Sequence, residues 1–333
     1  MTDAQGRRRV LVTGGQGYIG RHVVARFLAA GHTVVSLDRP GKLSRVRLEG
    51  ETPVGMDLVT AGPALEALLR EQSIGQVLHL AALTEVGESL RAPMRYYHQN
   101  LTGTLSLLAA MEAAGVRELV FASSAAVYGD PGDVVLRESS PLRPVNPYGA
   151  SKLLTEQILD DLVDRGRLAA ISLRLFNVMG TAQDAGLPEV EQSLGLIFPL
   201  LLTVSAERRA IRPEEYHRAG VLVRGYATPD GTVLRDYVHA TDVAEAFLRA
   251  SHAVAEGKAF GHYNIATGVS YSIDEVVAAV RAHTGQSLDL GWQPPQVGFP
   301  AILKADVTAA REQLGFTARL RTLAELLGGA PVA

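Results

Sequence analysis

Tyr148 and Lys152 are the residues whose types and spacing most clearly suggest chemistry. They lie four residues apart in the stretch 147–163, whose pattern predicts a helix with a proline near its start. Residues four apart share one face of a helix, so the two side chains should meet. An ammonium group beside a phenol favours the phenolate and lowers the pKa of the tyrosine, which makes it a usable base near neutral pH. Ser124, at the end of the predicted strand 118–124, offers a hydroxyl partner.

A glycine-rich turn near the N-terminus is the second feature that suggests chemistry. Gly14, Gly17 and Gly20 lie three apart between a short apolar stretch and a predicted helix. The first permits a tight turn, the second lets a pyrophosphate approach the backbone, and the third lets the helix pack closely on the strand. The next predicted strand, 33–37, ends in Asp38, about 20 positions beyond the glycines, where an acidic residue grips a ribose 2′-hydroxyl. The turn therefore predicts a dinucleotide site, and the carboxylate favours NAD because it repels a 2′-phosphate.

The elements that must position these residues are alternating strands and helices. Apolar runs predict strands at 10–13, 33–37, 76–82, 118–124 and 170–175, and helical spacing predicts helices at 63–72, 93–114 and 147–163. This alternation predicts an α/β fold with a doubly wound parallel (Rossmann) sheet. Such sheets bind ligands beyond the carboxyl ends of their strands. The residues that follow strand ends should therefore line one crevice: Gly14, Asp38, Ala82, Ser124 and Asn177.

The second half of the chain is less regular. We expect residues 1–180 to form the NAD-binding domain and residues 181–333 to form a smaller α/β substrate-binding domain. The segment 232–252 is expected to pack back onto the first domain. Amphipathic patterns predict helices at 242–253 and 272–283.

Composition limits the class of protein. The 333 residues carry a formal net charge of −3, which argues against a nucleic-acid surface. The absence of cysteine excludes disulfides and thiolate metal sites, and no metal site is expected. No apolar run approaches the ~20 residues of a membrane span, and no apolar signal segment precedes the first strand. We therefore expect a cytoplasmic protein with no membrane contact.

Taken together, these motifs resemble the extended short-chain dehydrogenase/reductase family. Within it the chain is most similar to the UDP-galactose 4-epimerases, from Val10 to about Leu314. The first group of matching motifs is Thr13-Gly14-Gly15-Gln16-Gly17-Tyr18-Ile19-Gly20, Asp38, Ser123-Ser124, Val127-Tyr128-Gly129 and Tyr148-x-x-x-Lys152. The second group is Val86-Gly87-Glu88-Ser89, Asn100-x-x-Gly103-Thr104, Arg174-Leu175-Phe176-Asn177 and Asp230-Gly231-Thr232-Val233-Leu234-Arg235-Asp236-Tyr237-Val238-His239.

The resemblance implies a reaction and a role for each catalytic residue. Tyr148 would deprotonate the C4 hydroxyl of a nucleotide-sugar, and Lys152 would tune it and hold the nicotinamide ribose. Ser124 would hydrogen-bond the reacting oxygen. A hydride would pass to NAD, the transient 4-keto sugar would turn over, and the hydride would return to its other face.

The resemblance also implies binding residues and a homodimer. The cofactor would contact Gly14, Gly17, Tyr18, Ile19, Gly20, Asp38, Asp57, Leu58, Leu80, Ala81, Ala82, Asn100, Tyr148, Lys152 and Phe176. The nucleotide-sugar, with UDP as the expected nucleotide, would contact Thr84, Ser124, Ala126, Tyr148, Asn177 and Arg235, with Arg235 as a phosphate partner. Helices such as 93–114 and 147–163 would join the two subunits.

Departures from the family pattern gather in the substrate half. Thr84 stands where the epimerases have a lysine, Gly195-Leu196 where they have paired asparagines, and Leu222 where an aromatic residue packs on uracil. The segment 293–298 lacks the arginine that clamps the second phosphate. These changes favour a non-standard sugar nucleotide. The arginines that could replace the missing one are Arg208, Arg209, Arg212, Arg218 and Arg224.

Three other functions remain open at this point. A dehydrogenase or reductase with exchangeable cofactor uses the same triad. A 4,6-dehydratase uses an Asp-Glu pair just before Val-Tyr-Gly, where this chain has Ala125-Ala126. A non-catalytic NAD sensor should have lost Tyr148 or Lys152. His79 and His98 are interpreted as structural, because no ligand lies at metal spacing from them.

Overall fold

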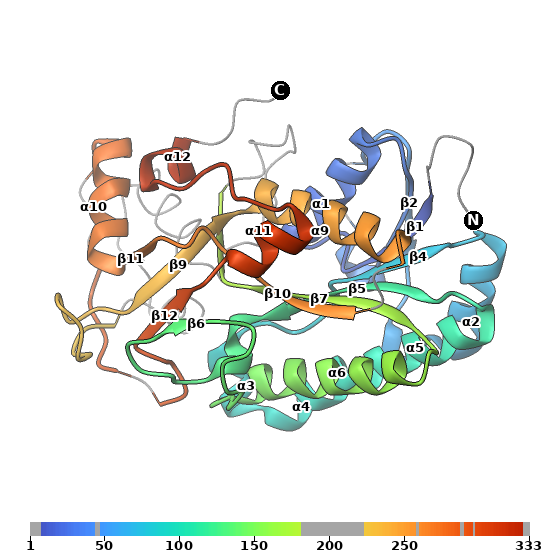
Figure 1. Cartoon of the computed structure of the whole chain (residues 1–333), viewed down its shortest axis with the longest axis horizontal. Coiled ribbons are helices and arrows are strands. Elements are labelled where there is room, and N and C mark those ends of the chain that lie inside the picture. The colour runs from blue at the N-terminus through green and yellow to red at the C-terminus, as the bar shows by residue number, and fades with distance from the viewer. Residues whose placement is uncertain are drawn as a thin grey trace.

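A parallel sheet of seven strands organises the computed structural model, which describes residues 8–43, 47–180, 223–257, 260–286, 290–295 and 297–328. The strands lie in the order β10-β7-β5-β4-β1-β2-β3, which confirms the predicted doubly wound α/β fold (Figure 1). Their bounds are β1 Arg9–Thr13, β2 Thr33–Asp38, β3 Glu51–Gly55, β4 Gln76–His79, β5 Glu118–Ser124, β7 Ala169–Leu175 and β10 Phe260–Ile265.

Helices cover both faces of this sheet (Figure 1). The face with α1 (Tyr18–Ala29), α9 (Ala240–Ala255) and α11 (Thr308–Leu314) shares a core that includes Phe27 and Phe247. The other face carries α2 (Leu58–Glu71), α3 (Val86–Arg91), α4 (Pro93–Tyr97), α5 (Gly103–Ala114) and α6 (Pro147–Asp164). Because apolar side chains fill both faces, the strands read as continuous hydrophobic runs.

A second, smaller group of strands lies beside the carboxyl end of the main sheet. β9 (Leu234–His239) pairs with β8 (Asn177–Met179), β11 (Ser270–Ser272) and β12 (Ile302–Ala305), and β12 pairs with β6 (Val135–Leu136). With α10 (Ile273–Thr284) and α12 (Leu323–Gly328) they enclose a separate apolar core. The two groups exchange elements: β6 comes from the first half of the chain, whereas α9 and β10 come from the second half and complete the main sheet layer.

Two predicted helix boundaries differ from the structure, and both differences have a local cause. The predicted helix 63–72 begins earlier, at Leu58, because the Asp57 side chain accepts a hydrogen bond from the Val59 amide and caps the helix. The backbone is not helical at Gly62, where φ is 40°, and this break separates the first turn from the rest of the helix. The predicted helix 93–114 is interrupted by a π-helical turn, His98–Thr102, between α4 and α5.

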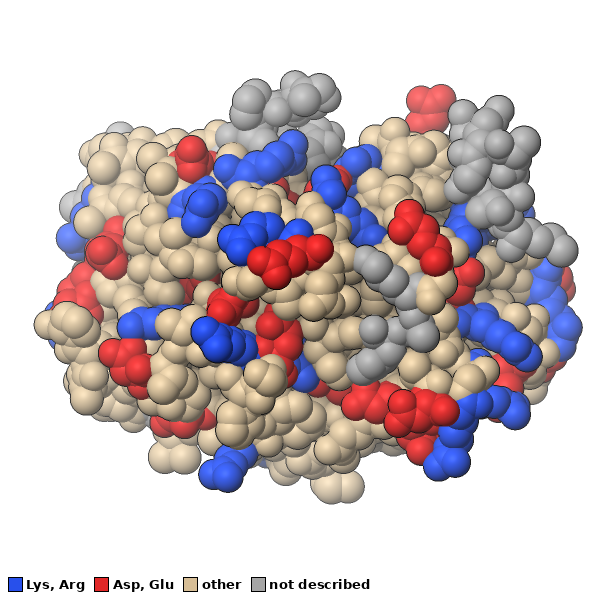
Figure 2. All heavy atoms as spheres, viewed as in Figure 1, with Lys and Arg blue, Asp and Glu red and all other residues tan. Residues whose placement is uncertain are grey.

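The face shown in Figure 2 has no large patch of a single charge sign, because lysine and arginine side chains are interspersed with aspartate and glutamate. This pattern agrees with the small net charge of the chain and differs from the basic stripe of a nucleic-acid interface. No helix in the described ranges is long and apolar enough to cross a membrane.

Candidate active site

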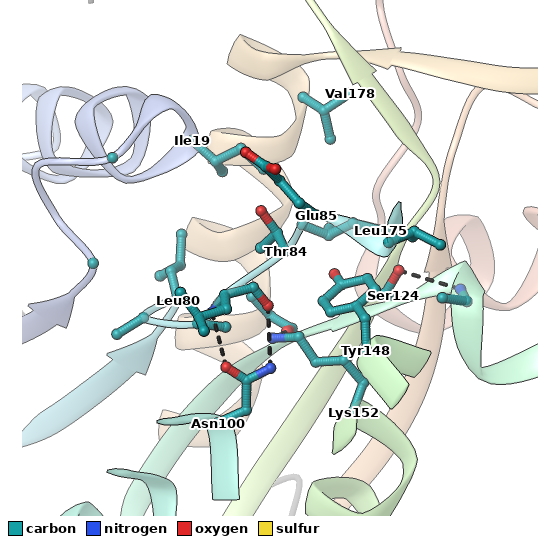
Figure 3. A pocket seen from close by; sticks show the side chains of 18 of the residues that line it. Ile19, Leu80, Thr84, Glu85, Asn100, Ser124, Tyr148, Lys152, Leu175 and Val178 are labelled. Atoms are coloured by element: carbon teal, nitrogen blue, oxygen red, sulfur yellow. Dashed lines mark hydrogen bonds between the residues drawn. The ribbon is translucent and has the colours of Figure 1, made fainter. Parts of the chain in front are cut away.

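One cavity of about 550 Å³ opens at the carboxyl ends of the parallel strands. All the site residues predicted from the sequence line it: Gly14, Gly17, Tyr18, Ile19, Gly20, Asp38, Asp57, Leu58, Leu80, Ala81, Ala82, Thr84, Asn100, Ser124, Ala126, Tyr148, Lys152, Phe176, Asn177 and Arg235. Figure 3 shows part of this wall, with Ile19 on one side and Ser124, Tyr148 and Lys152 on the other. The five residues that the strand-end argument places in one crevice, from Gly14 to Asn177, all line this cavity.

The glycine turn leaves no room for side chains. Gly14 has a φ of 71°, its amide donates to the Leu37 carbonyl at 2.7 Å, and a Cβ there would lie 2.8 Å from the Ala81 amide nitrogen. A Cβ on Gly20 would lie 2.0 Å from the Gly14 carbonyl oxygen. The turn is thus packed against both neighbouring strands and presents backbone to the cavity at the start of α1. This is the cradle that a dinucleotide pyrophosphate requires, so the residues present fit NAD.

We predict that Gly20→Ala weakens NAD binding at least tenfold, because the added methyl group must push the Gly14 carbonyl out of the turn. The measurement is the amount of NAD bound per chain at a series of NAD concentrations. Gly115→Ala is a poor control because Gly115 has a φ of 75°, whereas Gly41→Ala adds a Cβ with no atom within 4 Å and should bind NAD normally. Wild-type NAD binding by Gly20→Ala would contradict this account of the turn.

The Asp38 end of the cavity mixes one carboxylate with two cations. Asp38 accepts a hydrogen bond from the Arg39 amide at 2.9 Å, and burial raises its pKa. Arg39 and Lys42 also line the cavity, and their charges act in the opposite direction on that pKa. Asp38 thus lies where a ribose hydroxyl donor can satisfy it.

Asn100 shapes the cavity through the loop that follows β4. Its side-chain oxygen accepts from the Leu83 amide at 2.8 Å, and its amide nitrogen donates to the Leu83 carbonyl at 3.1 Å (Figure 3). The same nitrogen donates to the Ser151 hydroxyl at 2.9 Å. Asn100 is therefore predicted to act on the cofactor through the loop that it fixes as well as by direct contact.

Ser124, Tyr148 and Lys152 meet as the sequence predicts (Figure 3). The Ser124 oxygen accepts from the Ala126 amide at 3.2 Å, and Ser124 lies close enough to Tyr148 to lower its pKa. The Lys152 ammonium donates to the Ala122 carbonyl at 2.7 Å and lies 5.9 Å from the centre of the Tyr148 ring. α6 places both residues on one face because Asn146 caps its start and Pro147 fits its first turn.

Among the protein's own groups, burial rather than the Lys152 charge decides the direction of the Tyr148 pKa. Burial raises the pKa of Tyr148, and Ser124 lowers it by a smaller amount. Burial lowers the pKa of Lys152 to about 7, although the Glu156 carboxylate acts to raise it. Burial disfavours the charged form of each group, so it lowers the pKa of the Lys152 ammonium and raises that of the Tyr148 phenol.

Arg235 is a buried cation in the substrate half of the cavity. It is 3 % exposed, and its guanidinium donates to the carbonyls of Leu234 at 2.9 Å, Ala301 at 3.0 Å and Pro300. No carboxylate forms an ion pair with it within the described ranges, and burial lowers its pKa to about 10. A buried guanidinium without a counter-ion is arranged to receive an anion from the cavity.

Arg224, one candidate for the missing phosphate clamp, makes its contacts away from the cavity in this structure. Its guanidinium makes two hydrogen bonds to Asp274, at 2.7 and 2.8 Å, and lies 4.4 Å from the centre of the Trp292 ring. It is therefore engaged outside the cavity. The other candidates, Arg208, Arg209, Arg212 and Arg218, and the departures Gly195-Leu196 and Leu222 lie outside the described residues.

The sequence analysis missed several residues that line the cavity: Gln16, Glu85, Val145, Asn146, Gly298, Phe299, Pro300 and Leu303. Glu85 directly follows the predicted Thr84, so its place in the same loop was the signal that could have found it. Phe299 and Pro300 lie far along the chain in a loop, and only the path of β12 brings them to the site. Sequence spacing carries no signal for that contact.

His79 is structural, as interpreted from the sequence. Its ring nitrogens bond the hydroxyls of Thr13 at 2.7 Å and Thr104 at 2.9 Å, and burial lowers its pKa to about 3, which keeps it neutral. Across the part of the chain that the structure describes, no group of histidines and carboxylates could hold a metal ion.

Comparisons with known proteins agree with this site. The family model described as "NAD dependent epimerase/dehydratase family" matches residues 10–266. A UDP-glucose 4-epimerase of Bacillus subtilis is 35 % identical over 319 residues, which cover 93 % of this chain and 92 % of that protein. The human UDP-glucose 4-epimerase is 36 % identical, and the aligned region covers 94 % of this chain and 92 % of the human protein.

Solved structures give the same result. A UDP-glucose 4-epimerase from Stenotrophomonas maltophila, with bound NAD and formylated UDP-arabinopyranose, superposes with a TM-score of 0.86 at 33 % identity, covering 96 % of both chains. One from Bifidobacterium longum, in complex with NAD+ and UDP, superposes with a TM-score of 0.85 at 32 % identity, covering 96 % of this chain and 95 % of that one. The glycine turn, the Ser-Tyr-Lys triad and these matches over nearly the whole chain together show that it belongs to the NAD-dependent epimerase/dehydratase family.

Proposed function

We propose that this protein is an NAD-dependent nucleotide-sugar 4-epimerase. The observation that carries the proposal is that one cavity joins a pyrophosphate cradle, the Ser124-Tyr148-Lys152 triad and the buried cation Arg235. The cradle fits a dinucleotide, the triad fits the oxidation of an alcohol, and the cation fits the phosphate of a nucleotide-sugar. The solved relatives hold NAD together with UDP or a UDP-sugar, which supports the same assignment.

The triad acts on the C4 hydroxyl of the sugar. The Tyr148 phenolate takes the hydroxyl proton while the C4–H bond breaks with its electron pair and the C4–O bond becomes a carbonyl. When bound, NAD supplies a hydride acceptor that can return the same hydride, and its cationic ring favours the Tyr148 phenolate. Ser124 holds the reacting oxygen, and Lys152 adds a positive charge close to the phenol ring. After the ketone has turned, return of the hydride to the other face of C4, together with return of the proton from Tyr148 to the oxygen, gives the C4 epimer.

The second half of the chain supplies the substrate side in this proposal. We propose that residues 181–333 form the substrate-binding part, with Arg235 on β9 holding a phosphate of a UDP-sugar and Asn177 and Thr84 nearby in the wall. Thr84 and the cation-free segment 293–298 favour a sugar other than the usual glucose and galactose pair. The location we propose is the cytoplasm, as predicted from the sequence.

Cofactor retention tests this function against a net dehydrogenase. An epimerase regenerates its NAD in every turnover, so it has no need to release it. We expect the purified protein, denatured and analysed by liquid chromatography, to yield close to one NAD(H) per chain. A chain that releases its cofactor on simple dilution, and that consumes added NAD or NADH in proportion to product, contradicts the proposal.

We also propose a homodimer that forms through α4, α5 and α6, on the face of the main sheet opposite α1 and α9. Met94 on α4, Leu105 on α5 and Leu154 on α6 expose large apolar side chains. Figure 1 shows these three helices on the same side of the main sheet. Exposed apolar patches of this kind mark interaction sites, and a self-complementary face of helices gives a twofold dimer.

Leu105→Glu should convert the dimer to a monomer, because it buries a charge in the proposed interface. The measurement is the mass in solution by light scattering after gel filtration. Leu105 is 50 % exposed, and Val134, which is 49 % exposed and lies outside these helices, provides the matched control Val134→Glu. A wild-type monomer, or a dimer that persists in Leu105→Glu, would contradict the interface.

A further inference from the structure

A buried carboxylate lies one helical turn beyond Lys152. Glu156 is 1 % exposed and Lys152 is 4 % exposed, and both point from α6 toward the sheet. The Glu156 carboxylate accepts hydrogen bonds from the Ser123 hydroxyl at 2.5 Å and from Arg174 at 3.0 Å (Nε) and 2.8 Å (the second guanidinium nitrogen). Neither Glu156 nor Arg174 lines the cavity. The cluster of Glu156, Ser123 and Arg174 therefore acts on the site through the elements that it joins.

The cluster ties three elements of the site together. Ser123 and Arg174 are register partners on β5 and β7, and Ser123 directly precedes Ser124. Arg174 also donates to the Tyr128 hydroxyl and to the Glu138 carbonyl, both at 3.0 Å. The Glu156 carboxylate therefore fixes the helix that carries Tyr148 and Lys152 against the strand end that carries Ser124.

The charge of Glu156 also acts on Lys152. Burial lowers the pKa of Lys152 to about 7, and the Glu156 carboxylate opposes that shift. His79 on β4 faces Lys152 as a neutral ring, because its own pKa is lowered to about 3. Arg174 on β7 is a cation near Glu156, and their charges compensate each other.

Two more titratable groups lie on the far side of Glu156. The Nδ1 of His262 on β10 lies 3.6 Å from the Glu156 carboxylate, and its Nε2 lies 3.4 Å from Asp160, one turn further along α6. Burial lowers the pKa of His262 and raises that of Asp160 to about 6. Both groups titrate below Lys152, whose pKa is about 7, so changes at neutral pH and above report on Lys152 and Tyr148.

We propose that Glu156 is a positioning residue for the reaction. It locks the helix of Tyr148 and Lys152 onto the strand of Ser124, and its charge favours the ammonium form of Lys152. The kinetic consequence rests on the proposed epimerase function, whereas the effect on the charge of Lys152 does not.

The charge of Lys152 can be measured without any substrate. The chain has four lysines, at positions 42, 152, 258 and 304, so selective ¹³C-lysine labelling gives few NMR signals, and Lys152→Arg assigns the one of interest. We expect Glu156→Gln to lower the titration midpoint of Lys152 by about one pH unit. The neutral amide no longer opposes the two effects that disfavour the ammonium form, which are burial and the positive charge of Arg174. Asp161→Asn is the matched control, since it removes a carboxylate of the same helix whose partner Arg165 is exposed, and it should leave the midpoint unchanged.

Kinetics test the positioning role. Glu156→Gln should lower kcat by about 10- to 100-fold with KM changed by less than about threefold, and should move the alkaline limb of the kcat profile to lower pH. Ser123→Ala keeps the Glu156 charge and the Arg174 pair, so it should lower kcat several-fold without moving the Lys152 midpoint. A merely structural role lowers thermal stability but leaves the pH profile of the folded enzyme unchanged.

The outcomes separate this inference from the proposed function. An unchanged Lys152 midpoint in Glu156→Gln overturns the role of its charge, even if the wild type acts on no sugar at all. If Glu156→Gln fails to fold because Arg174 is left buried without its partner, Ser123→Ala decides the positioning role, and a wild-type kcat in that variant overturns it. A wild type that interconverts no nucleotide-sugar contradicts the proposed function alone.

Discussion

Replacing Tyr148 with phenylalanine is expected to lower kcat by about 10²- to 10⁴-fold, the usual contribution of a positioned general base. The change removes one oxygen and leaves the ring, which lies 5.9 Å from Lys152, in place. The proton of the sugar hydroxyl then has no base to take it, because a neutral serine hydroxyl such as Ser124 is a very weak base and the Lys152 ammonium is a donor bonded to the Ala122 carbonyl. The measurement is steady-state turnover of the substrate, together with the NAD content of the variant.

Tyr271→Phe provides the matched control for this result. The Tyr271 hydroxyl donates to the Arg321 carbonyl at 3.1 Å and does not line the cavity, so its loss should leave kcat unchanged. We expect Tyr148→Phe to retain NAD, because the glycine turn is untouched. A Tyr148→Phe variant with more than a tenth of the wild-type kcat would show that another group is the base.

Replacing Arg235 with methionine should lower kcat/KM by about 10²- to 10³-fold, chiefly through KM. Methionine keeps much of the side-chain length but removes the charge that Leu234, Pro300 and Ala301 hold in place with their carbonyls. Losing a buried, charge-assisted contact to a phosphate costs binding in the ground state and the transition state alike. The measurement is KM for the nucleotide-sugar and the inhibition constant of the free nucleoside diphosphate, both of which should rise.

Arg224→Met is the control that the structure offers. Arg224 is paired with Asp274 and stacks on Trp292, so its loss should change stability slightly and KM hardly at all. An Arg235→Met variant with wild-type KM, or an Arg224→Met variant with a larger effect on KM than Arg235→Met, would contradict the assignment of the phosphate partner.

The cofactor half of the site follows from the sequence because its determinants are local. The glycine turn, Asp38 and the residues after each strand belong to short segments, and parallel strands put their carboxyl ends at one edge. The helix of Tyr148 and Lys152 is equally local, because four-residue spacing alone puts them on one face.

The remainder depends on contacts between distant segments. Arg224 looked available in the sequence, and only the packing of α10 shows that Asp274 engages it. Burial raises the pKa of Tyr148, and the spacing of residues in the sequence does not reveal how deeply a side chain is buried. Glu156 was unremarkable as one more polar residue of an amphipathic helix, and its role emerges only once β5 and β7 bring Ser123 and Arg174 to it.

The most direct test of the proposed function is to incubate the purified protein with a panel of nucleotide-sugars, without added cofactor, and to separate the products. We expect one pair of C4 epimers to interconvert to the same equilibrium mixture from either side, which would also name the substrate. No turnover until NAD or NADH is added, with a stoichiometric change in nicotinamide absorbance, would contradict the epimerase and identify a net oxidoreductase.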